Sequence, residues 1–215
     1  MSGEPSADYE TMGHRFLEHY RQACRRVLKE FRRNQKLHGG RIHCRPGCTD
    51  CCHHLFQISE IEAAEISRFV KQLPAAGRDL LQARARPYRS ARDDIMLRHG
   101  YLDARGNLPS PETRLACPAL LDGECVLYDH RPLICRKYGI PLADPSQPRR
   151  VFACELNFRP GEQINDSQLV EIQTGLAESW RKAQRDYDYA GGRRHDLPIS
   201  VADAILEDFE DYLPR

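Results

Sequence analysis

The chain contains the stretch Cys44-Arg45-Pro46-Gly47-Cys48-Thr49-Asp50-Cys51-Cys52, which places four of its nine cysteines within nine consecutive positions. The other five cysteines are Cys24, Cys117, Cys125, Cys135 and Cys154. Thiols at such short spacing, in a chain whose start lacks a secretory signal, are typical of metal sites. We therefore expect metal binding by these cysteines to organise the centre of the fold.

Length and composition predict one domain with a modest core. The chain has 215 residues, of which 40% are hydrophobic, and its 32 basic and 31 acidic side chains nearly cancel. This balance neither predicts nor excludes a polyanionic partner, and the few aromatic residues near the basic segments disfavour nucleic-acid binding. No apolar run is long enough for a signal sequence or a membrane span, so we expect a cytoplasmic protein. An odd number of cysteines in a reducing compartment argues against a disulfide framework.

Apolar residues at helical spacing predict a mainly α fold. The expected helices cover 14–34, 60–73, 77–99 with a bend near Pro87, 166–187, and a last stretch from Ser200 to Leu213. Ser59 and Glu62 form a capping box before the second helix. Cys24 lies on the apolar stripe of the first helix, which favours core packing over metal binding. We expect a flexible N-terminus over 1–13 and a single domain over 14–215, with C-terminal helices over 166–213.

The segment 100–158 differs in composition, with frequent prolines and glycines and no regular hydrophobic periodicity. Short strands are expected over 125–128 and 150–153, and a short helix from Pro132 to Tyr138. Burial in this segment looks too sparse to offset the backbone entropy that folding removes. The predicted architecture is therefore a single domain of helices around an irregular, cysteine-lined metal-binding centre over 41–158, with a few short strands.

The spacing of the first cysteines suits chelation. Cys44-x3-Cys48 and Cys48-x2-Cys51 both match the two- to four-residue separation of zinc ligand pairs. A helix starting near Cys48 would bring Cys48, Cys51 and Cys52 onto one face and lower their pKa through its N-terminal charge. We also expect at least one arginine to donate hydrogen bonds to ligand sulfurs. The candidates that could neutralise the site are Arg45, Arg131, Arg136 and Lys137.

Two further patterns near this stretch leave alternatives open. His43, His53 and His54 could each bind zinc or iron, but eight thiols already suffice for two tetrahedral sites, so second-shell or surface positions are favoured. The pattern Cys44-x3-Cys48-x2-Cys51 also matches the triple cysteine of radical S-adenosylmethionine enzymes. A basic helix precedes it here and no alternating strand–helix series follows, which disfavours that class. Another kind of iron–sulfur cluster stays open.

Several short motifs follow one another along the chain: the first cysteine stretch, Ser59-Glu60-Ile61-Glu62-Ala63, Cys117-Pro118-Ala119-Leu120, Cys125-Val126-Leu127-Tyr128, Arg131-Pro132-Leu133-Ile134-Cys135-Arg136 with Gly139, and Cys154. Together they resemble the YkgJ-type cysteine-cluster family, which is expected to chelate zinc or iron. Its cysteine-rich module is also similar to part of flagellin lysine N-methylases. The resemblance covers roughly 41–158 and implies metal ligands drawn from Cys44, Cys48, Cys51, Cys52, Cys117, Cys125, Cys135 and Cys154.

Several functional hypotheses follow from the sequence. The first is a metal-binding protein, structural or involved in metal handling, with zinc or iron, including an iron–sulfur cluster, as the cofactor. The second is an iron or iron–sulfur enzyme that modifies a protein substrate, although no glycine-rich loop after a strand offers a methyl-donor site. The third is a zinc module that binds nucleic acid. The sequence decides neither whether the chain is an enzyme nor whether eight thiols form one centre or two.

Overall fold

The computed structural model describes residues 7–99, 114–144, 147–159 and 161–215 and is mainly helical, as predicted. In chain order its elements are α1 (Ala7–His38), η1 (Gly39–Arg41), η2 (Asp50–His53), α2 (Glu60–Gln72), α3 (Ala75–His99), β1 (Leu120–Leu121), β2 (Glu124–Cys125), η3 (Tyr128–His130), α4 (Leu133–Lys137), β3 (Leu142–Asp144), β4 (Gln147–Phe152), α5 (Leu169–Tyr189), α6 (Val201–Leu206) and η4 (Phe209–Tyr212), where η denotes a 3₁₀ helix.

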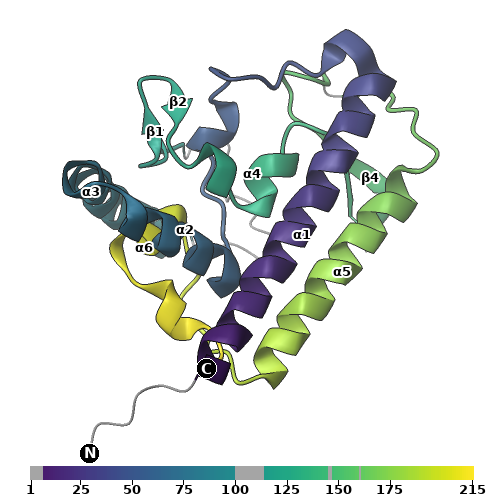
Figure 1. Ribbon diagram of the computed structural model, residues 1–215. Helices are drawn as coiled ribbons and strands as arrows, with labels where there is room; N and C mark the ends of the chain where they lie inside the picture. Colours follow the sequence, from purple (N-terminus) through teal and green to yellow (C-terminus); the bar gives the residue numbers. More distant parts are fainter. Residues whose placement is uncertain (1–6, 100–113, 145–146, 160) are drawn as a thin grey trace, which may run out of the picture.

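The longer helices form a frame around the irregular segment (Figure 1). Helices α1 and α5 run antiparallel against each other, while α2 packs against α1, α6 and η4, and α6 packs against α3. The apolar core lies between these helices and includes fully buried Leu17 of α1, Ile61 and Ile66 of α2, and Phe209 of η4. Among the described residues, no helix combines the length and the apolar character needed to cross a membrane.

Two capping boxes fix helix starts in this frame. Ser59 accepts a hydrogen bond from the Glu62 amide, and the Glu62 carboxylate accepts one from the Ser59 amide, as predicted. Ser200 and Asp203 form the same arrangement at the start of α6. Such boxes satisfy amide groups that the first turn of a helix leaves unpaired. Both helices therefore begin where their sequences indicate.

Several element boundaries differ from the predictions. Helix α1 begins at Ala7, so residues 7–13, expected to be flexible, form its first turns. The expected C-terminal helix divides into α6 and η4. The buried Ser67 hydroxyl lies 2.9 Å from the carbonyl oxygens of Ala204 and Glu207 and accepts a 3.2 Å hydrogen bond from the Phe209 amide. These contacts from α2 satisfy main-chain groups where the helix ends.

The irregular segment forms two small antiparallel hairpins, β1–β2 and β3–β4. The first turns through Asp122 and Gly123, whose φ angles of 48° and 82° fall in the left-handed region. The strand expected over 125–128 ends at Cys125, because the chain then turns into η3. The strand expected over 150–153 is longer and spans Gln147–Phe152, and the short helix after Pro132 is present as α4.

Candidate metal centre

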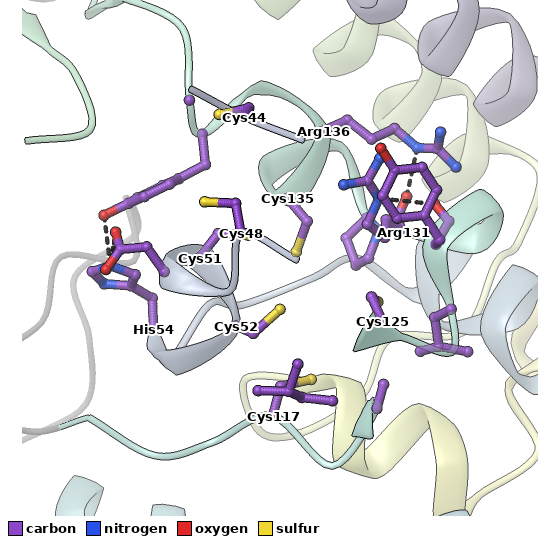
Figure 2. A pocket seen from close by; sticks show the side chains of 18 of the residues that line it. Cys44, Cys48, Cys51, Cys52, His54, Cys117, Cys125, Arg131, Cys135 and Arg136 are labelled. Atoms are coloured by element: carbon purple, nitrogen blue, oxygen red, sulfur yellow. Dashed lines mark hydrogen bonds and ion pairs between the residues drawn. The ribbon is translucent and has the colours of Figure 1, made fainter. Parts of the chain in front are cut away.

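Eight of the nine cysteines line one cavity of about 300 Å³. They come from the segments around η1 and η2, from the segment just before β1, from β2, from α4, and from the turn after β4. Figure 2 shows most of them around the cavity together with Arg131 and Arg136. The eight are Cys44, Cys48, Cys51, Cys52, Cys117, Cys125, Cys135 and Cys154. The ninth, Cys24, is buried on α1 in the apolar core, in accordance with the predicted packing role.

The cluster Cys48–Cys52 does not begin an α-helix, contrary to the prediction. A hydrogen bond from the Cys48 amide to the Arg45 carbonyl closes a turn, and only Asp50–His53 form a 3₁₀ helix. The Cys117 amide then donates to the Cys52 carbonyl at 2.7 Å, which brings the later segment alongside η2. Cys51 and Cys52 therefore face the later cysteines through main-chain pairing between distant parts of the sequence.

Side chains of the helical frame fix the later thiols in place. The Tyr20 hydroxyl donates to the Arg131 carbonyl at 2.6 Å, and the Glu62 carboxylate accepts from the Leu133 amide at 2.8 Å. These two bonds flank Pro132 and position α4, which carries Cys135. The Arg84 guanidinium donates to the carbonyls of Pro118 and Leu120, beside Cys117.

Cys44 lies against a glycine and an asparagine. A Cβ atom added at Gly139 would be 2.0 Å from the Cys44 sulfur, so this approach requires glycine. The Asn157 amide donates to the Cys44 sulfur at 3.4 Å and to the Gly139 carbonyl at 2.6 Å, and its oxygen accepts from the His43 amide. Asn157 thus joins three segments around one sulfur. Sequence reasoning missed it, because nothing in the local sequence marks its partner 113 residues away.

The predicted arginine–sulfur hydrogen bonds are absent among the described residues, and Asn157 provides such a contact instead. The Arg131 Nε donates to the Tyr128 carbonyl at 2.8 Å, and the Arg136 Nε donates to the Arg131 carbonyl at 2.7 Å. Both arginines, with Arg45, still line the cavity, whereas Lys137 does not. The hydrogen bond from Cys52 is the main cause that lowers the pKa of Cys125, and the charges of Arg131 and Arg136 lower it further through space.

The thiols are mostly held in their neutral form. Burial raises the pKa of Cys117 to about 12 and that of Cys154 to about 11, and it also raises the pKa of Cys135 well above its usual value. A hydrogen bond from Cys52 lowers the pKa of Cys51. The predicted lowering of thiol pKa values by a helix N-terminus does not dominate, because η2 is a single short turn. A metal ion would have to displace these protons, because the thiolate is the form that binds.

Of the three histidines considered as ligands, only His54 lines the cavity. Its Nε2 lies 2.5 Å from the Tyr138 hydroxyl and 3.6 Å from Asp50 Oδ2. Asp50 Oδ1 accepts a 2.6 Å hydrogen bond from Arg114. Asp50 stands inside the first cysteine stretch, so a search for oxygen ligands would have found it. Within the described residues, no three His, Cys, Asp or Glu side chains stand as a ready-made metal site.

The donor set fits a metal that prefers sulfur. Thiolates favour zinc and iron–sulfur clusters over hard cations such as magnesium. Comparisons with curated proteins and with solved structures found no match. A family model described as "CxxCxxCC: Putative zinc- or iron-chelating domain" matches residues 43–150, about half of the chain, and ends before Cys154. By this match and by the cysteine stretch that carries it, the chain belongs to the CxxCxxCC family.

Proposed function

We propose that the thiolates of the eight cavity cysteines bind zinc or iron together, and that the chain is a cytoplasmic metal-binding protein. One observation carries this proposal. Eight cysteines from distant segments line one cavity, whereas the ninth packs in the apolar core. Free thiols gathered around one cavity have few structural uses apart from metal binding. When bound, the metal would cross-link segments 41–54 and 114–154.

The size of the cavity favours more than one metal atom. The cavity volume of about 300 Å³ is roughly ten times the volume of a water molecule in the liquid. A single ion bound by four sulfurs would leave much of that volume unfilled. Eight sulfur donors also exceed the four that one zinc ion takes. This observation keeps an iron–sulfur cluster, and with it an enzyme that modifies a protein substrate, as the second candidate function.

Purification without oxygen, followed by metal analysis and visible spectroscopy, tests the proposal. We expect zinc or iron to copurify, with iron and acid-labile sulfide giving a brown protein that supports the redox alternative and colourless zinc supporting a structural role. Cys135→Ser should lower the metal content. Cys24→Ala is the matched control and should keep the wild-type content while costing about 1 kcal/mol of stability. Purified protein that binds neither metal would contradict the proposal.

A further inference from the structure

The thiol cavity opens to solvent on one side, where apolar and aromatic side chains line it. Leu28 of α1 and Tyr128 of η3 both belong to the lining, and they are 43% and 44% exposed. We refer to this open side as the rim. Small-molecule sites in proteins combine apolar walls with a few fixed polar groups. The apolar part of such a site is therefore present at the rim.

Arg131 and Arg136 supply fixed polar groups next to these side chains. Arg131 Nε donates to the Tyr128 carbonyl at 2.8 Å, and the central carbon of its guanidinium lies 3.6 Å from the centre of the Tyr128 ring. Arg136 donates to the carbonyls of Arg131 and Asp129. Figure 2 shows the two arginines together, across the cavity from His54. Both guanidinium groups are therefore oriented by main-chain carbonyls before any ligand binds.

The positive charges of these two arginines are not balanced locally. Among the residues that the structure describes, neither forms an ion pair, although both line the cavity. Two carboxylates share the lining, but Asp50 is bound by Arg114, and exposed Glu124 contacts neither arginine. The Nη groups of Arg131 and Nη1 of Arg136 have no acceptor in the described part of the chain. The rim thus holds two oriented cations with free donors.

A carboxylate is the acceptor that suits these donors. The planar guanidinium offers parallel N–H groups that match the two oxygens of a carboxylate. A phosphate dianion would lose more hydration on entering a cavity lined by thiols and apolar side chains. Leu28 and Phe31 lie on α1, which packs against α4 and whose Tyr20 hydroxyl donates to the Arg131 carbonyl. Apolar and cationic side chains therefore border the same opening.

From these contacts we propose that the rim binds an organic carboxylate. Arg131 and Arg136 bind its two oxygens, and its apolar part lies against Leu28 and Tyr128. A counter-charge for metal-bound thiolates would be expected to donate to a sulfur. Neither arginine does so among the described residues, and both keep donors free at the rim. This ligand site goes beyond the proposed metal-binding function and uses none of the cysteines.

Calorimetric titration of protein purified without oxygen tests the site with hexanoate as the probe. Hexanamide has the same apolar chain without the charge, and inorganic phosphate has the charge without the chain. We expect hexanoate to bind about tenfold to a hundredfold more tightly than hexanamide, as hydrogen bonds to a charged group contribute. It should also bind more tightly than phosphate. Equal affinity for hexanoate and hexanamide, or tighter binding of phosphate, would overturn the proposed ligand class.

Variants at the rim locate the binding. Arg131→Ala should weaken hexanoate binding about tenfold or more, and Arg131→Lys, which lacks the planar group, should restore only part of the affinity. Leu28→Glu, at an exposed position, should prevent binding through charge repulsion. The matched controls are Arg181→Ala and Leu197→Glu, at exposed residues that do not line the cavity. Both controls should bind hexanoate as the wild type does.

The metal content of every variant separates this site from other roles of the arginines. If Arg131→Ala lowers the metal content and no form of the protein binds hexanoate, the arginines only balance thiolate charge and the proposal fails. Hexanoate binding that survives unchanged in Arg131→Ala would place the carboxylate elsewhere and would also overturn it. Absence of metal from the wild type would contradict the proposed function and leave the hexanoate test intact.

Discussion

The helical frame (α1, α2, α3, α5, α6) and the cysteine centre (41–58 and 114–158) are held together by different interactions. The frame depends on apolar packing, with Leu17, Ile61 and Ile66 almost completely buried. In the part that the structure describes, the centre has only short helices and two small hairpins. The frame contacts its main chain through polar side chains such as Tyr20 and Glu62. The frame therefore positions the main chain of the centre through polar contacts, while Cys117 and Cys125 also pack against its apolar core.

The largest effect should come from the frame. Ile66→Ala removes a completely buried side chain and should lower the free energy of unfolding by about 2–5 kcal/mol, measured by denaturant titration of the metal-loaded protein. Its metal content should match the wild type as long as it stays folded. Loss of metal from the folded variant would show that the two regions are not separable.

Next in size is a steric change in the centre. Gly139→Ala places a Cβ atom 2.0 Å from the Cys44 sulfur, so we expect a cost of about 1–3 kcal/mol and a lower metal content. Gly175→Ala is the matched control in α5, where an added Cβ meets nothing within 4 Å, and it should stabilise by about 0.5–1 kcal/mol. Wild-type metal content in Gly139→Ala would refute the assigned contact.

The smallest effect tests the connection between the two regions. The Glu62 carboxylate accepts from Ser59 with one oxygen and from the Leu133 amide with the other, and glutamine offers a single acceptor. Glu62→Gln should cost about 1–2 kcal/mol and also lower metal content. Asp203→Ala removes the equivalent box at α6, so it should cost stability without altering metal content. Equal metal content in both variants would show that the hydrogen bond from the Leu133 amide to Glu62 does not contribute to metal binding.

Local sequence patterns made the helical frame predictable, whereas details of the cysteine centre depend on long-range contacts and could not be predicted. The apolar spacing and the Ser59–Glu62 box act within one or two helical turns, so α1, α2 and the start of α6 follow from sequence. The chelate spacing predicted that the first cysteines belong together, the family resemblance implied the four later ones, and all eight line one cavity. The Asn157–Cys44 contact and the 3₁₀ form of η2 depend on pairing with segments more than 60 residues away, which local patterns do not encode.

Hydrogen exchange measured by mass spectrometry, with and without metal, tests the central claim most directly. Protein purified without oxygen is compared with the same protein after removal of metal by a strong chelator, with thiols kept reduced. We expect amides over 114–144 to exchange much faster once metal is removed, while α2 keeps its protection through its packing. Unchanged protection over 114–144 would contradict the claim that metal organises the cysteine centre, as would simultaneous loss of protection in both regions.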